Sequence, residues 1–563
     1  MLFSVTEPHI SLPTLLSEIE KYGTLSNLKI NQTKSEAMSM SLSPLSRDSI
    51  RANFCFKWSP MLRYLGTNIP SKEKDIFKMI FLPMYNLLRA LLDKWRLGSH
   101  SWFGRISIIK MSVLPKILYL LQALPIKIPV TFLRQIRSLF MNFIWAGKRP
   151  RIKRDLLTMP KNLGGMGVPD IFKYYYAVHL SRLVDWCKHV RSKRWVDIEQ
   201  QLSTVPLGRA PWCYTVLPAP LKNHPIIGTT LKITARICQN GNFSTVRSPL
   251  FPILGNPSFS PGNERGSFRL LIEKGVYQAS HFIISENWPS IKTLIQIGGP
   301  FEVNIWQALQ LSNFFRSLGP GSNFHRQLTI FESYCNDLEP LARGISKMYG
   351  LLNKFREDQE IPGLNKWEKD LDRTFSALQR KQIIFLTLNS SICTRIQELN
   401  YKILMQWYHT PVRLKKFCNE NSDRCWRCGE ESGTLIHIFW FCKKIRVYWL
   451  SIMRILQKNS ELKIPNDPAF FLLHLSEIPV QTYRNSVLCH LVNAAKAGIP
   501  LRWRDTTSPT VLEWINRVRD IEAMEDLVLS AKGKNKLYKE TWKSWNLFKN
   551  SDEGKRLMTE PDK

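Results

Sequence analysis

The chain has 563 residues and a formal net charge of +34, with 79 Lys and Arg against 45 Asp and Glu. Apolar residues make up 44% of the sequence, which excludes wholesale disorder and predicts packed cores in more than one domain. The basic excess makes a polyanion the expected partner, with RNA and DNA favoured over a membrane surface.

The sequence favours an intracellular protein of the nucleus and cytoplasm. Its 11 cysteines form no disulfide framework, and the first residues, MLFSVTEPHI, lack the basic and apolar regions of a signal peptide. The longest apolar run, residues 106–130, is interrupted by Lys110, Pro115, Lys116 and Pro125. We therefore expect buried helices there and no association with a membrane.

The first seventy residues predict a small α/β element. Ser11 is the expected N-cap of a helix whose apolar stripe stops at Gly23. A short strand is expected over Leu28–Ile30. A second extended piece should turn at the string Tyr64, Leu65, Gly66, with the glycine at positive φ.

Three consecutive helices are expected next, and together they predict a compact bundle. The first runs over Ile76–Trp95. The second, Arg105–Leu124, is kinked or split at Pro115 because proline cannot donate to the preceding turn. Thr131 caps the third. Two basic residues lie off the apolar face of this third helix: Arg134 and Arg137.

A run of cations follows the third helix in the string KRPRIKR. Its five members are Lys148, Arg149, Arg151, Lys153 and Arg154. Cations beside Trp145 and an irregular loop suit a groove that follows a nucleic-acid backbone, although a solvated face is the alternative. If all five bind phosphates, log affinity should fall against log salt with a slope of about −3.5 on single strands.

The most specific pattern is C-x2-C-x8-H-x4-C, formed by Cys425, Cys428, His437 and Cys442. Three thiolates and one imidazole at this spacing are typical of a closed, structural zinc site. The alternative is a set of ordinary buried cysteines. The sequence therefore predicts Zn²⁺ as a structural cofactor.

Basic and aromatic residues surround these four ligands. Arg427, Lys443 and Lys444 are expected to contact nucleic acid. Among the aromatic residues, Phe441 is expected in the core of the zinc segment, whereas Trp426 and Trp440 suit either the core or a surface for stacking.

Six blocks of sequence, taken in order, resemble the polymerase protein of non-LTR retrotransposons of the long interspersed element type. The blocks are Tyr22–Glu36, Tyr64–Ile69, Trp95–Lys116, Phe143–Tyr175, Cys425–Cys442 and Arg502–Trp514. Two residues separate the first two cysteines here, where family members often have three, and this spacing still suits zinc.

The resemblance implies a mainly α fold with a small α/β element at the N-terminus: a partial palm, a helical thumb and a helical C-terminal region with a zinc knuckle. Lys34 falls in the turn that resembles motif D, and Tyr64, Leu65 and Gly66 resemble the primer grip. The implied segments are 1–72 (palm), 73–147 (thumb), 148–350 (connecting region), 351–530 (C-terminal helices with the zinc knuckle at 425–442) and 531–563 (a basic, disordered tail).

The resemblance also implies an RNA-directed DNA polymerase without its catalytic carboxylates. In this family an Ala-Asp-Asp turn precedes a segment similar to Leu2–Val5, which would place the aspartates upstream of Met1, and the sequence contains no Asp-Asp pair. We therefore expect no polymerase activity from this chain alone, with Mg²⁺ needed only in a full-length enzyme. Retroelement RNA and a catalytic N-terminal half are the implied partners; a host-adopted zinc protein that binds other proteins or nucleic acid is the alternative.

Overall fold

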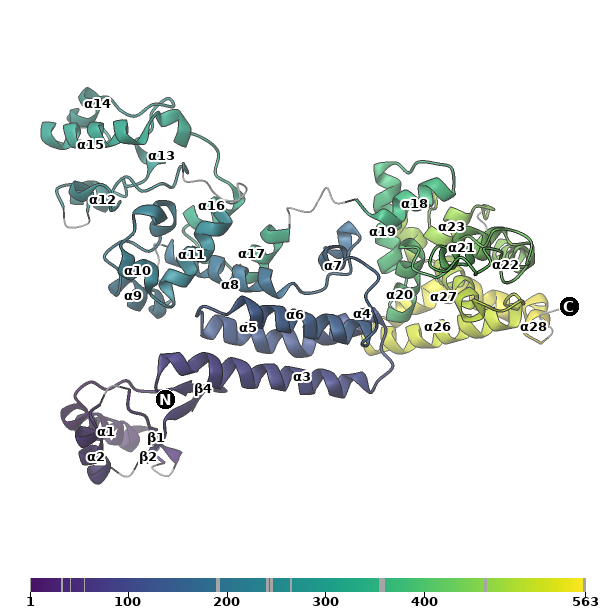
Figure 1. The fold of residues 1–563 in the computed structure, drawn as a ribbon, viewed down its shortest axis with the longest axis horizontal. Helices are drawn as coiled ribbons and strands as arrows, with labels where there is room; N and C mark the ends of the chain where they lie inside the picture. Colours follow the sequence, from purple (N-terminus) through teal and green to yellow (C-terminus); the bar gives the residue numbers. More distant parts are fainter. Residues whose placement is uncertain are drawn as a thin grey trace. The chain divides into compact units, whose positions relative to one another are not determined.

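The computed structural model describes residues 2–31, 34–40, 42–54, 56–188, 193–238, 243, 247–263, 266–353, 360–459 and 463–559. The fold is mainly helical with two small two-stranded sheets, which confirms the predicted fold class at this level (Figure 1). Gln32 and Thr33 of the first resemblance block, and residues 560–563 of the predicted tail, lie outside the described residues.

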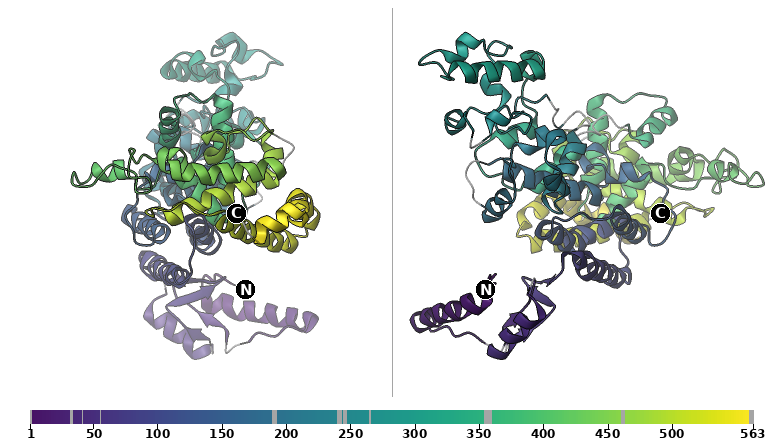
Figure 2. Two further views of the ribbon diagram at one scale, coloured as in Figure 1. Left: turned by 90° about the vertical axis from the view of Figure 1, so that its right-hand side faces the viewer. Right: turned by 60° about the vertical axis from the view of Figure 1, so that its left-hand side comes forward.

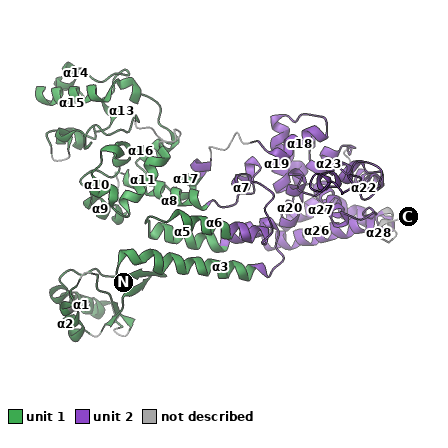
Figure 3. Cartoon of the chain, in the orientation of Figure 1, with its two compact units in different colours: residues 1–95, 112–139, 171–349 green, residues 96–111, 140–170, 350–563 purple. Residues whose placement is uncertain are grey.

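The chain forms two compact units, and neither is a single consecutive segment (Figure 3). Unit 1 contains residues 1–95, 112–139 and 171–349, and unit 2 contains residues 96–111, 140–170 and 350–563. The sequence predicted segments that follow one another along the chain. It did not predict that residues 96–111 and 140–170 belong to the same unit as residues 350–563.

Unit 1 begins with short strands between helices. Its elements up to residue 139 are α1 (Pro8–Ser26), β1 (Glu36–Ala37), α2 (Pro44–Asn53), β2 (Lys57–Trp58), β3 (Met61–Tyr64), β4 (Thr67–Pro70), η2 (Glu73–Asp75), the π-helical turn η3 (Phe77–Phe81), α3 (Leu82–Arg96), α5 (Leu114–Ala123) and the first part of α6 (Val130–Trp145).

The later part of unit 1 consists of short helices joined by loops. They are α8 (Ile171–Trp186), α9 (Arg194–Gln201), η6 (Ala210–Val216), α10 (Ala219–Asn223), α11 (Ile227–Cys238), η7 (Ser260–Gly262), α12 (Arg269–Glu273), α13 (Ala279–Phe282), α14 (Ile291–Ile295), α15 (Ile305–Leu318), η8 (Gly321–Phe324), α16 (Ile330–Asn336) and most of α17 (Gly344–Asn353). Figure 2 gives two further views of these elements.

The hairpin β3–β4 agrees with the sequence. The two strands pair antiparallel, with Tyr64 opposite Thr67. Leu65 and Gly66 between them have φ of 46° and 78°, as a two-residue turn of the I′ kind requires. The predicted positive φ at Gly66 is therefore confirmed.

The start of the chain differs from the expectation. Helix α1 begins at Pro8, after Glu7, and continues past Gly23 to Ser26, so neither the Ser11 cap nor the Gly23 stop is correct. Leu28–Ile30 forms no strand; the parallel pair is β1 with β2 instead. A strand needs a hydrogen-bonded neighbour, and none of the described residues pairs with this segment.

Two of the expected helices contact each other through aromatic rings. Phe132 of α6 meets Phe77 and Phe81 edge-on, with ring centroids 5.2 and 6.1 Å apart. The helix is not split at Pro115: this residue lies in the first turn of α5, directly after the π-helical turn η4 (Ile109–Val113), and the helical stretch continues through it.

One continuous helical stretch, Trp102–Ala123, is long and apolar enough to cross a membrane by length and composition alone. The core helix of a soluble protein meets the same criteria. Several side chains along the stretch, among them Phe103, Ile106 and Ile117, are buried. The stretch therefore does not indicate a membrane.

Unit 2 contains the helices that carry the cysteine–histidine set. Its elements are α4 (Trp102–Ile108), the first part of η4, the end of α6, α7 (Arg154–Thr158), η5 (Lys161–Leu163), α18 (Pro362–Asp370), α19 (Ala377–Asn389), α20 (Thr394–Leu404), α21 (Pro411–Lys415), the π-helical turn η10 (His437–Phe441), α22 (Lys443–Asn459), α23 (Pro468–Leu473), α24 (Val480–Arg484), α25 (Val487–Gly498), η11 (Ile499–Arg502), α26 (Val511–Ala531), α27 (Asn535–Asn550) and α28 (Asp552–Thr559).

The end of unit 2 corrects the predicted disordered tail. Residues 535–559 form α27 and α28, and α27 contacts α25 and α26. Trp542 and Trp545 of α27 are fully buried, and the Trp542 indole N–H donates to Glu525 at 3.3 Å. The lysines suggested an exposed tail, but two tryptophans on one helical face supply an apolar surface that outweighs them.

Candidate metal centre

The first two cysteines lie on a tight turn in unit 2. The N–H of Gly429 donates to the carbonyl of Cys425 at 2.8 Å, and the N–H of Cys425 donates to the carbonyl of Glu431 at 2.8 Å. Gly429 has φ of 74°, a conformation that costs glycine least. The turn therefore brings both thiols to one side of the loop.

The other two ligands flank the π-helical turn η10. His437 begins it, and Cys442 follows its last residue, where the Cys442 N–H donates to the His437 carbonyl at 2.8 Å. This i→i+5 bond returns the chain toward the histidine just before α22 begins. The five-residue spacing from His437 to Cys442 is thus the spacing of this turn.

The four donor atoms fit a tetrahedral zinc site. All lie within 4.8 Å of one another. Cys425 Sγ is 4.0 Å from Cys442 Sγ, and Cys428 Sγ is 3.4 Å from His437 Nε2. Zn–S bonds of about 2.3 Å and Zn–N bonds of about 2.0 Å imply edges of about 3.8 and 3.5 Å. The donor set, the spacing and the distances agree with zinc, which would hold η10 against the Cys425–Cys428 turn.

A carboxylate orients the histidine ligand. His437 Nδ1 lies 3.0 Å from Glu431 Oε2, while Nε2 faces the sulfur atoms. Such an outer partner fixes the tautomer and the ring orientation of a metal-binding histidine. The geometry therefore assigns Nε2 as the metal ligand, while the Nδ1–H group donates a hydrogen bond to Glu431.

The thiols differ in their ease of ionisation. Burial opposes ionisation of Cys428, but hydrogen bonds from the backbone N–H groups of Glu431 and Glu430 and from the side chains of His437 and Cys425 together lower the Cys428 pKa to about 6. Burial raises the pKa of Cys425 to about 11. Bound zinc would supply the positive charge that keeps all the thiols ionised.

Arg427 is buried, although the sequence predicted that it contacts nucleic acid. Its side chain is only 3% exposed. The guanidinium donates to the carbonyls of Ile438, Arg502 and Thr507, at 3.0 to 3.3 Å. The bonds to Arg502 and Thr507 join the zinc turn to a segment 75 residues or more away, so Arg427 holds the zinc segment in place.

The remaining residues around the zinc ligands divide between surface and core. Lys443 and Lys444 are exposed, with Lys443 paired to Glu430 and Lys444 donating to the Thr506 carbonyl at 3.1 Å. Trp440 is buried against Trp449, with ring centroids 5.3 Å apart. Phe441 is 54% exposed, contrary to its expected place in the core, because the π-helical turn directs it outward.

The cation run between α6 and α7 is mostly exposed, as a surface that binds phosphate requires. Lys148, Arg149, Lys153 and Arg154 are exposed, and Arg154 lies 3.5 Å from the carboxylate of Asp155. Arg151 instead stacks on another part of unit 2. Ile152, in the middle of the run, is buried and fixes the loop to the core.

The other expected site residues belong to unit 1. Arg134 is exposed, and the Arg137 guanidinium lies over the Phe172 ring at 5.1 Å. Lys34 is exposed, and its backbone N–H donates to Asn31 Oδ1 at 3.1 Å. The hairpin turn of Tyr64, Leu65 and Gly66 is exposed, and the Tyr119 hydroxyl donates to the Leu65 carbonyl at 2.7 Å.

Unit 2 also brings together residues that sequence reasoning did not group. Arg151, Trp407, His409, Arg413 and Arg504 converge beside the zinc segment. The sequence carries no local signal for this cluster, because it draws one residue from the cation run, three from around α21 and one from beyond η11.

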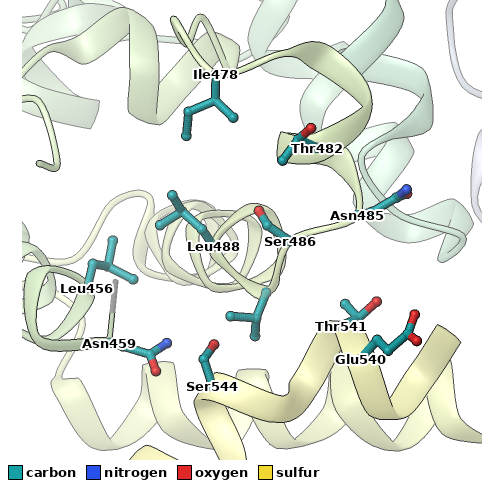
Figure 4. A pocket seen from close by; sticks show the side chains of 11 residues that line it. Leu456, Asn459, Ile478, Thr482, Asn485, Ser486, Leu488, Glu540, Thr541 and Ser544 are labelled. Carbon is teal, nitrogen blue, oxygen red and sulfur yellow. The ribbon is translucent and has the colours of Figure 1, made fainter. Parts of the chain in front are cut away.

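A cavity of about 240 Å³ in unit 2 lies between α22, α24, the start of α25 and α27 (Figure 4). Its lining mixes apolar side chains with amides and hydroxyls, and Glu540 is the only ionisable group among the lining residues. A single carboxylate, paired with Lys536 at 3.9 Å, supplies no acid–base pair and no metal ligand set. The cavity therefore offers no catalytic arrangement.

No family model matches the chain.

Proposed function

We propose that this chain binds single-stranded RNA and DNA through basic surfaces on a zinc-stabilised fold, as the non-catalytic part of a polymerase of the non-LTR retrotransposon type. The observation that carries the proposal is the set of four ligand atoms within 4.8 Å, positioned in a segment rich in Arg, Lys and aromatic residues. Zinc in this role is structural, and the surrounding cations provide the affinity.

The charges on the surface support a polyanion as the ligand. The net charge is +34, and four cations of the run after α6 are exposed. Phosphates of the backbone attract such cations irrespective of base sequence, and the attraction weakens as salt displaces them. The proposed polymerase family rests on the resemblance of the ordered blocks of sequence. A motif D role for Lys34, and a primer-grip role for Tyr64, Leu65 and Gly66, are part of the same proposal.

The test is a salt titration of RNA binding by the full chain loaded with zinc. Replacing Lys148, Arg149, Lys153 and Arg154 by glutamine should reduce the magnitude of the log–log slope by about 2.8, since each lost phosphate contact on a single strand removes about 0.7. A charge-matched control replaces Arg47, Lys57, Lys72 and Lys78 of unit 1. If the salt slope changes equally in both variants, the cation run is not part of the proposed RNA-binding surface.

A further inference from the structure

Arg151 lies on an aromatic platform inside unit 2. Its guanidinium is 3.4 Å from the centroid of the Trp407 ring, and Trp407 packs edge-on against Trp102 at 5.3 Å. The same guanidinium contacts His409 Nε2 through Nη1. Because an arginine is always a donor, His409 accepts this bond and carries its own proton on Nδ1.

Two more arginines lie around His409. Arg413 follows it by four residues, in the first turn of α21, and donates to the Gln406 carbonyl at 3.3 Å. The indole N–H of Trp503 donates to the His409 carbonyl at 2.7 Å, which places the next residue, Arg504, beside the same loop. Burial lowers the pKa of His409, and Arg151, Arg413 and Arg504 lower it further.

No acid among the described residues neutralises this cluster. Arg151, Arg413 and Arg504 form no ion pair with a carboxylate in the described part of the chain. Bringing three like charges together costs free energy unless an anion or solvent compensates. The cluster therefore has the charge of an anion site.

An exposed aromatic ring borders the cluster. The Phe417 ring is 6.2 Å from the His409 ring, and the Phe417 side chain is 70% exposed. Arg504 lies 5.7 Å from the Trp426 ring, so the cluster reaches the zinc turn itself. An exposed flat ring next to unpaired cations is the arrangement on which single-stranded nucleic acids bind, with phosphates on the cations and bases on the rings.

We propose that Arg151, Arg413 and Arg504 form a phosphate site for single-stranded nucleic acid beside the zinc turn, and that Phe417 stacks on a base next to that phosphate. The inference rests on the proposed function and names one site for it. The ligand is a nucleic acid rather than a phosphopeptide because the ring is exposed at the edge of the arginine cluster, where an unpaired base can lie flat.

The first experiment compares two variants of the full, zinc-loaded chain with a labelled single-stranded RNA. One replaces Arg151, Arg413 and Arg504 by glutamine. Its charge-matched control replaces the exposed Lys532, Lys534 and Lys536 by glutamine. The arginine variant should lower the magnitude of the salt slope by about 2, whereas the lysine variant should leave it unchanged.

A milder variant keeps the test valid if the triple variant fails to fold. Arg504 is exposed, and its side chain donates no hydrogen bond to the backbone of the described residues, so Arg504→Gln should fold and lower the slope magnitude by about 0.7. Phe417→Ala should weaken binding of the intact RNA at least about fivefold, with little effect on an abasic strand of the same length.

The outcomes separate the inference from the proposed function. If the wild-type chain binds no RNA, both are wrong. If it binds RNA, and the arginine and lysine variants have equal slopes, only the phosphate site is wrong. A Phe417→Ala variant that loses equal affinity for intact and abasic strands overturns the stacking role. Displacement of RNA by a phosphopeptide with equal affinity would overturn the assignment to nucleic acid.

Discussion

His437 Nδ1 lies 3.0 Å from the carboxylate of Glu431, and the opposite nitrogen of the same ring faces the thiol of Cys428 at 3.4 Å. The carboxylate comes from the turn that carries the first two cysteines, whereas the histidine comes from η10. Glu431 therefore connects the two halves of the candidate zinc site and sets the direction in which the imidazole donates its lone pair.

Replacing Glu431 by glutamine should weaken zinc binding by about 10- to 100-fold, because the imidazole loses the partner that orients it and raises its basicity. Competition with a coloured chelator measures the dissociation constant. Glu430→Gln is the matched control: it removes the same charge one residue away, from a carboxylate that pairs with Lys443 and not with the histidine. Equal affinities of the two variants would show that Glu431 plays no part in binding.

Replacing Cys442 by serine should abolish tight zinc binding, since Cys442 is fully buried and supplies one of the four donor atoms. Cys418→Ser is the control. Cys418 is exposed and lies outside the cluster, so the Cys418→Ser protein should still bind one zinc ion per chain. Metal analysis of the purified proteins gives the stoichiometry. If the Cys418 variant also loses zinc, the assignment of the four ligands is wrong.

Replacing Arg427 by methionine should reduce the free energy of unfolding by about 3 kcal/mol or more, because three backbone carbonyls lose a charged donor. Denaturant unfolding measures the change. Arg424→Met is the control, since Arg424 is exposed and donates to one carbonyl, that of Glu430. If Arg427→Met unfolds like the wild type and loses RNA affinity instead, Arg427 contacts the ligand after all.

Lys496 predicts a distinctive dependence of stability on pH. It is fully buried, its Nζ lies 2.7 Å from His474 Nε2, and burial lowers its pKa to about 7 from an ordinary value of 10.5. Between these values the unfolded chain holds a proton that the folded chain has released. Stability therefore rises with pH across this window, by as much as about 1.4 kcal/mol per pH unit.

The Lys496→Met variant isolates this contribution. Its free energy of unfolding at neutral pH should exceed that of the wild type, since the buried amine is replaced by an apolar side chain of similar length. The difference between the two proteins should shrink as pH rises from about 7 toward 10. A difference that stays constant over this range would mean that Lys496 keeps its proton in the folded chain.

Local patterns in the sequence predicted the features that depend on near neighbours. The spacing of Cys425, Cys428, His437 and Cys442 predicted their clustering, which the structure confirms. Gly66 predicted a hairpin turn, and Pro115 predicted an irregularity in its helix, where the structure has the π-helical turn η4 directly before α5. Each depends on the backbone conformation of a few consecutive residues, so composition and spacing carry enough information.

Contacts between distant segments could not be predicted in this way. In the sequence Arg427 resembles a surface cation, whereas in the structure its guanidinium is bonded to the carbonyls of Arg502 and Thr507. The lysines after residue 531 suggested disorder, whereas the burial of Trp542 and Trp545 depends on α25 and α26. Without tertiary contacts, charge alone places Arg427 and the lysine-rich C-terminal segment at the surface. Contacts with distant segments instead bury Arg427 and the tryptophans of that segment.

The most direct test of a zinc-stabilised nucleic-acid-binding protein is the affinity of the full chain for a single-stranded RNA, measured over a range of salt concentrations with zinc bound and after chelation. We predict that the zinc-loaded chain binds with an affinity that falls steeply as salt rises, and that chelation weakens the binding. Absence of binding by the zinc-loaded chain, or an affinity independent of salt, would contradict the account.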